Sequence, residues 1–75
     1  MYYIIEHQIR PDGIINTTET ARSTYALAVS YYHERYSKMV VNEQFVSVAL
    51  MLTDAELKVM EHAVVPTQYK EGEHE

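Results

Sequence analysis

The chain has 75 residues, with six lysines and arginines, eleven aspartates and glutamates and no cysteine, and its formal net charge is −5. A chain this short forms one small domain that buries only about 60% of the surface it exposes when unfolded. The acidic balance argues against a nucleic-acid-binding protein, since phosphate affinity depends on clustered lysine and arginine. No apolar run reaches the roughly 18 residues of a membrane-spanning helix, and the N-terminus has no basic start and no cleavage site of a signal peptide. We therefore expect a cytoplasmic protein with no membrane association and no nucleic-acid partner.

Two β-branched and aromatic segments separated by a turn predict a β-hairpin over residues 2–20. Residues 2–9 (YYIIEHQI) are typical of a first strand, and residues 14–18 (IINTT) of a second. Residues 10–13 (RPDG) provide the turn between them. Proline presets φ there, aspartate caps its own backbone and glycine takes positive φ freely.

Over residues 23–40 the apolar pattern changes to the period of a helix. The apolar residues fall at spacings of three and four and form one stripe: Tyr25, Ala28, Val29, Tyr32, Tyr36, Met39 and Val40. Ser23 or Thr20 is the expected N-cap. Lys38 lies in the last turn, where the helix dipole favours a cation. We therefore predict one amphipathic helix.

Residues 44–53 predict a strand whose two faces are both apolar. Alternation places Val46, Val48, Leu50 and Leu52 on one face, and Phe45, Ala49 and Met51 on the other. Two apolar faces are typical of a strand that is covered on both sides.

Residues 54–65 fit two different structures. Residues 53–56 match a helix capping box, and the apolar residues that follow keep helical spacing. The same segment contains three β-branched valines, which favour a strand that follows a short loop at residues 54–56. We prefer the strand, because residues 57–65 match the preceding strand in length, and the helix stays open as the alternative. Pro66 ends the element in either case.

The expected order is strand–strand–helix–strand–strand, an α+β fold of the ββαββ type. Its simplest packing is a four-stranded antiparallel sheet with the single helix packed on one face. A helical last element would give ββαβα instead. Residues 1–66 are expected to form one small domain, and residues 67–75 (TQYKEGEHE) a disordered acidic tail.

Several segments carry a family resemblance. An opening Tyr-Tyr-Ile-Ile strand, a Pro-Asp-Gly turn, a helix with Tyr-Tyr-His-Glu at residues 31–34, a Val-Ser-Val-Ala-Leu strand and an acidic tail follow in this order. Together they resemble small uncharacterised proteins encoded in phages and prophages of gut Firmicutes. The resemblance covers most of the chain, and it implies the hairpin–helix–hairpin layout and a phage or bacterial origin, but no activity. Those relatives often carry a glycine in the second hairpin turn, whereas residues 54–57 here contain none.

No residue pattern indicates catalysis or a cofactor. Two glycines cannot form a phosphate-binding loop, and the chain has neither a cysteine nucleophile nor a Gly-x-Ser-x-Gly elbow. The histidines are His7, His33, His62 and His74. They are not spaced as metal ligands, and the carboxylates adjacent to His33 and His62 would point away from them. We therefore expect no metal and no cofactor.

The remaining acid–base candidates are two glutamates on the expected first and last strands. Glu6 and Glu61 are expected to be exposed or paired with a basic side chain, the candidates being Arg10, Arg22 and Lys58. A chain of this length also has little room for a ligand cavity of about 300 Å³. We expect that the protein is not an enzyme, unless a site forms between subunits.

Tyrosine makes up seven of the eight aromatic residues, and six of the seven lie in the first strand and the helix. We expect their rings to pack on the sheet with the hydroxyls at its edge. A recognition surface is one alternative. Base stacking is another, but it would need a basic groove, and the lysines and arginines are scattered.

An oligomer is the expected state, because one helix covers one face of such a sheet and leaves apolar surface exposed. The candidate interface residues are Phe45, Ala49, Met51, Tyr2 and Ile4. We therefore expect a non-enzymatic interaction or accessory protein that forms a homodimer. The alternative is an acidic inhibitor or nucleic-acid mimic that binds a basic host protein, although its carboxylates look dispersed rather than regularly spaced on one face.

Overall fold

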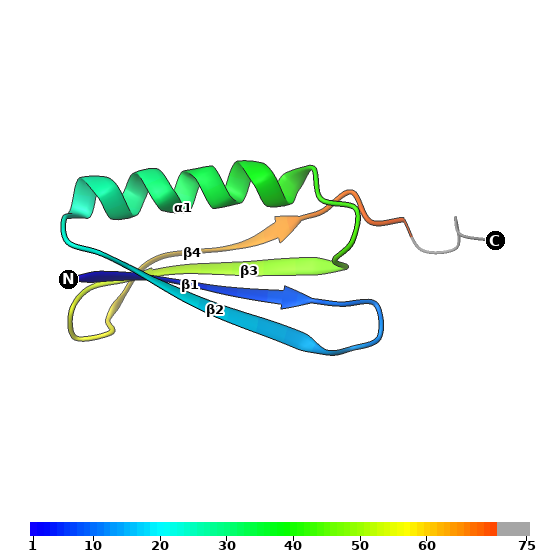
Figure 1. The fold of residues 1–75 in the computed structure, drawn as a ribbon, viewed down its shortest axis with the longest axis horizontal. Helices are drawn as coiled ribbons and strands as arrows, with labels where there is room; N and C mark the ends of the chain where they lie inside the picture. The colour runs from blue at the N-terminus through cyan, green and yellow to red at the C-terminus, as the bar shows by residue number, and fades with distance from the viewer. Residues whose placement is uncertain (71–75) are drawn as a thin grey trace.

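The computed structural model describes residues 1–70, which form a four-stranded antiparallel sheet with one helix lying across one face (Figure 1). The elements are β1 (Tyr2–Ile9), β2 (Ile15–Arg22), α1 (Tyr25–Val40), β3 (Ser47–Thr53) and β4 (Val59–Pro66). The strand order is β2-β1-β3-β4. The predicted ββαββ fold is confirmed, and the ambiguous segment that follows β3 forms a turn and a strand rather than a helix.

The first hairpin follows the predicted turn chemistry. β1 and β2 pair without interruption from Tyr2 opposite Arg22 to Ile9 opposite Ile15. In the turn, Gly13 takes a φ of 89°, and the Asp12 carboxylate accepts a hydrogen bond from the Ile14 amide at 3.0 Å. β2 is paired with β1 along its whole length and forms one edge of the sheet.

Helix α1 begins one residue after Thr24, whose hydroxyl accepts a hydrogen bond from the Leu27 amide at 3.2 Å. The expectation that Ser23 or Thr20 caps the helix was therefore wrong. The helix connects β2 to β3, which are parallel to each other because each is antiparallel to β1 between them. The chain thus crosses over β1, and this crossover places the helix over the middle of the sheet.

The hydrophobic core lies between α1 and the sheet. Its buried members are Ile4, Ala28, Tyr32, Met39, Val48, Leu50, Leu52 and Val65. The three buried apolar residues of β3 belong to the alternating set predicted from the sequence, and Leu50 is only 1% exposed. The fourth residue predicted for that face, Val46, precedes the strand and is 47% exposed. It is outside the strand because the Asn42 side chain caps the amides of Gln44 and Phe45 in a loop after the helix.

The second hairpin is closed by Asp54. Its carboxylate accepts hydrogen bonds from the amides of Glu56 and Lys58, both at 2.9 Å. Leu57 takes a φ of 64° in this turn, a conformation that favours glycine. The residues that match a helix capping box thus cap a β-turn instead. A register shift at Leu52 and Thr53 adds a bulge to β4.

The segment after β4 is held to the connection between α1 and β3. The hydroxyl of Thr67 lies 2.7 Å from the Phe45 carbonyl oxygen, and the Gln68 amide donates to the Asn42 carbonyl at 2.7 Å. Hydrogen-bonded structure therefore continues past the predicted domain end at residue 66. Residues 71–75 of the expected tail lie outside the described residues.

Candidate interaction surface

Among the described residues, no helix or strand covers the face of the sheet opposite α1 (Figure 1). We call it the open face. Directly paired residues of antiparallel strands point to the same side of a sheet, so the register defines its members. They are Tyr3, Ile5, His7 and Ile9 of β1, Ile15, Thr17, Glu19 and Ala21 of β2, Ser47, Ala49, Met51 and Thr53 of β3, and His62, Val64 and Pro66 of β4. Thr53, at the end of β3, is only 1% exposed.

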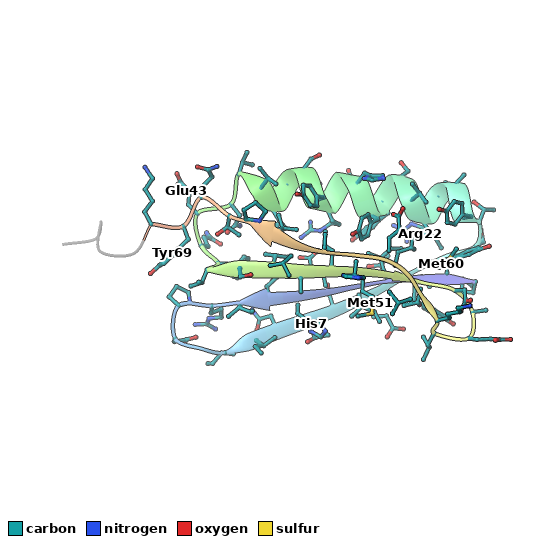
Figure 2. All side chains as sticks on the ribbon, turned by 180° about the vertical axis from the view of Figure 1, so that it is seen from behind. His7, Arg22, Glu43, Met51, Met60 and Tyr69 are labelled. Carbon is teal, nitrogen blue, oxygen red and sulfur yellow. The ribbon has the colours of Figure 1, made fainter. Side chains whose placement is uncertain are left out.

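Two rows of side chains cross the centre of the open face. One row runs Glu19, Ile5, Met51, His62, and the next runs Thr17, His7, Ala49, Val64. The members on the two central strands are half-buried by their neighbours, whereas Val64 on the edge strand is 73% exposed. Figure 2 shows His7 and Met51 on the side of the sheet away from the helix. The centre of the open face is therefore mainly apolar, and its polar and charged residues are mostly on the outer strands.

The structure divides the five predicted interface residues between the two sides of the sheet. Ala49 and Met51 lie on the open face, opposite His7 and Ile5. Ile4 is opposite Leu52, is 2% exposed and belongs to the core beneath α1. It is therefore not available to a partner. The prediction that Ile4 shares an interface with Met51 was wrong, because alternation within a strand does not fix which residues of two strands share a face.

The other two predicted interface residues also pack on the helix side. The Tyr2 ring packs edge-on against Tyr25 of α1, with ring centroids 5.7 Å apart. Phe45 lies before β3 and is packed against the core. Neither residue contributes to the open face, since Tyr2 shares the side of Ile4 and Phe45 lies outside the regular alternation of β3.

A buried ion pair connects the sheet to the helix. Glu6 of β1 is only 3% exposed, and its two carboxylate oxygens accept hydrogen bonds from Arg35 of α1 at 2.7 Å and 2.8 Å. The Gln8 side-chain amide donates to the same carboxylate. Sequence analysis missed this pair and named Arg10, Arg22 or Lys58 as the partner. A bidentate arginine–carboxylate pair is geometrically specific, so it fixes how α1 sits on β1.

Burial by itself would raise the pKa of Glu6, but the hydrogen bonds from Arg35 and Gln8 outweigh it and lower the pKa below its ordinary value. The same pair raises the pKa of Arg35. Both groups are therefore charged over the whole physiological range. A carboxylate held in this state is a structural contact rather than an acid or base for catalysis.

Four of the described tyrosines belong to the hydrophobic core or pack against it: Tyr2, Tyr31, Tyr32 and Tyr36. Tyr32 is 5% exposed, and burial, followed by the negative charge of Glu61, raises its pKa. The guanidinium of Arg22 lies over the Tyr31 ring, 4.6 Å from its centroid. Among the described tyrosines, the sheet register puts Tyr3 alone on the open face.

The described residues contain no group of three histidine or acidic side chains that could hold a metal ion. His7 and His62 lie on the open face, and His33 is exposed on α1. His74 is outside the described residues.

An open depression of about 300 Å³ lies beside the second hairpin turn and is lined by Met1, Tyr2, Asp54, Ala55 and Glu56. The Asp54 carboxylate in its lining is already hydrogen-bonded within the turn.

No helix within residues 1–70 has the length and apolar character needed to cross a membrane. No protein-family model, no curated protein and no solved structure matches this chain.

Proposed function

We propose that this protein is a non-enzymatic interaction protein that acts as a homodimer, with the open face as the surface between the two copies. The family resemblance supports a phage or prophage accessory protein in the cytoplasm of a bacterial host. The observation that carries the dimer is the one-sided packing of the sheet: α1 covers one face, while the other presents Ile5, Met51 and Ala49 at its centre.

The size of the open face supports a second copy as the occupant. Four strands spaced about 4.8 Å apart, each about eight residues long and rising about 3.3 Å per residue, give a face of about 500 Å². Two such faces packed together bury about 1,000 Å², which is the lower bound for a specific interface between proteins. Sheets pack face to face in this way in β-sandwiches, at a small angle set by their twist.

The distribution of charge also favours the homodimer over the acidic mimic. A mimic of nucleic acid needs carboxylates in a regular array on one surface. Here Glu6 is buried and paired, Glu34 is paired with Lys38 on the outer surface of α1, and Glu19 is the single acidic member of the open face. The open face therefore suits an apolar contact with its own copy better than contact with a basic protein.

Light scattering coupled to size exclusion, from micromolar to hundreds of micromolar protein, tests the proposal. The wild type should elute as a dimer. Met51→Lys, at the centre of the open face, should shift it to the monomer of 8.7 kDa. Leu27→Lys is the matched control, because Leu27 is an apolar side chain 53% exposed on α1, away from the open face. It should stay dimeric.

Circular dichroism checks that each variant is folded. If Met51→Lys does not fold, Val64→Lys replaces it, since Val64 is 73% exposed in the monomer and contributes little to the core. A wild-type monomer over the whole concentration range, or a folded Met51→Lys or Val64→Lys that dimerises as tightly as the wild type, would refute the open face as the dimer surface.

A further inference from the structure

We infer that the dimer is sensitive to pH, and that protonation of His7 at the centre of the open face separates the two copies. The inference rests on the proposed homodimer and concerns how pH regulates the contact at the open face. It depends on where His7 lies, what surrounds it and what charge would be buried with it.

His7 occupies the middle of the open face. It lies on the central strand β1, opposite Ala49 on one side and Thr17 on the other. Its neighbours along β1 on this face are Ile5 and Ile9. A copy packed over this face would cover the imidazole on all sides, because the surrounding side chains already half-bury it in the monomer.

The neutral imidazole suits such a place. Its Nδ1 is hydrogen-bonded to the Thr17 hydroxyl at 2.8 Å, so one ring nitrogen has a partner from within the same chain. An imidazolium would bring a full charge into the apolar centre of the interface, and burying a charge without a paired counter-ion is costly. Two-fold symmetry brings the second His7 toward the same region, which adds repulsion between like charges.

The charged groups that face His7 are few. β2 contributes Glu19, one position along the strand from Thr17 on the same face. β3 contributes Ser47, Ala49 and Met51, which carry no charge, and His62 on β4 lies two strands away beside Met51. In the described residues no ion pair joins Glu19 to His7. Glu19 lies on an exposed edge strand, where solvent and salt weaken its attraction, so it compensates an imidazolium only in part.

The direction of the effect follows from these contacts. Histidine is the side chain that ordinarily changes charge between pH 5 and 8. Burial in the dimer disfavours the imidazolium of His7 more than the environment of the monomer does. The dimer is therefore tightest in neutral and mildly alkaline solution, and it weakens as the pH falls. Dissociation frees two His7 side chains, and each of them can take up a proton. We therefore expect the dissociation constant of the dimer to rise at least about tenfold between about pH 8 and pH 5.5.

The test is the dimer dissociation constant measured by analytical ultracentrifugation at about pH 8 and pH 5.5, with wild type, His7→Gln and His62→Gln. Glutamine keeps hydrogen-bonding capacity but does not titrate. The dimers of the wild type and of His62→Gln should weaken at low pH. The dimer of His7→Gln should have the same dissociation constant at both pH values. Circular dichroism of the Met51→Lys monomer at pH 5.5 checks that the fold persists, which the lowered pKa of Glu6 favours.

The outcomes separate the two proposals. A wild type that is dimeric with the same dissociation constant at both pH values, or a His7→Gln variant that keeps the full pH dependence, overturns the role of His7 and leaves the dimer standing. A wild type that is monomeric at pH 8 overturns the dimer itself, and the pH control with it.

Discussion

Replacing Arg35 with methionine should strongly destabilise the fold, because it leaves the Glu6 carboxylate 3% exposed with Gln8 as its remaining partner. Removing one member of a buried pair costs about 3–5 kcal/mol. Because the Arg35 side chain is 22% exposed, we expect the lower end, about 3 kcal/mol. A domain of this length has about 4–11 kcal/mol of total stability. The same loss corresponds to a fall in Tm of about 12–24 °C.

The pH dependence of this loss has a definite sign. The pKa of Glu6 is lowered in the folded protein, so the pair contributes its full stability above the unfolded pKa of about 4.3. This contribution is lost as the pH falls through the lower folded value. In Arg35→Met the buried carboxyl can protonate, which relieves the unpaired charge. The difference between wild type and variant should therefore be largest near pH 7 and shrink below about pH 4.

Urea denaturation at one fixed protein concentration measures these differences, since the stability of a dimer depends on concentration. Lys38→Met is the control, because it breaks an exposed pair with Glu34 on the same helix, at 3.6 Å, and should cost less than about 0.5 kcal/mol. Adding Glu6→Leu to Arg35→Met should recover most of the loss, since an apolar pair can replace a buried ion pair. If Arg35→Met costs no more than Lys38→Met, the reasoning is refuted.

Three further predictions concern the second turn, the C-terminal segment and nucleic acid. Leu57→Gly should raise the free energy of unfolding by about 0.5–1 kcal/mol. Leu57 is 61% exposed, and its φ of 64° is energetically unfavourable for any residue other than glycine. A lower urea midpoint would contradict this prediction. Deleting residues 67–75 should leave the chain folded but cost about 1–2 kcal/mol through the lost hydrogen bonds of Thr67 and Gln68, so an unchanged midpoint would count against it. DNA, single- or double-stranded, should show no saturable gel shift at about 100 mM salt, since the net charge is −5; sub-micromolar binding would overturn that expectation.

The layout of the fold could be predicted from the sequence because each element is marked locally. The Pro-Asp-Gly turn separates two β-branched segments, and the apolar period changes at the start of α1. The last element was harder, since residues 53–56 satisfy a helix signal and a turn signal at once. Asp54 decides between them, because its carboxylate closes the hairpin loop. Leu57 takes the left-handed backbone in that turn, a conformation that favours glycine.

The buried pair could not be predicted in the same way, because Glu6 and Arg35 are 29 residues apart. A signal was nevertheless present in the local patterns. Glu6 follows Ile4 on the apolar side of β1, and Arg35 lies one turn from Tyr32 and Met39 on the apolar stripe of α1. A negative charge thus interrupts the apolar side of β1, and a positive charge interrupts the apolar stripe of α1. Because these two surfaces pack together and exclude water, the two charges are expected to pair with each other.

The same alternation that hides Glu6 separates the two tasks of β1. Its even-numbered residues, among them Ile4 and Glu6, face α1 and hold the fold together. Its odd-numbered residues, among them Ile5 and His7, form the centre of the open face. Adjacent positions of β1 therefore differ in what a substitution should affect. A change at Glu6 should alter the stability of the fold, whereas in the proposed homodimer a change at His7 should alter the contact between the two copies. This separation would allow a domain with so small a core to use the open face for the proposed dimer contact without weakening the packing that keeps it folded.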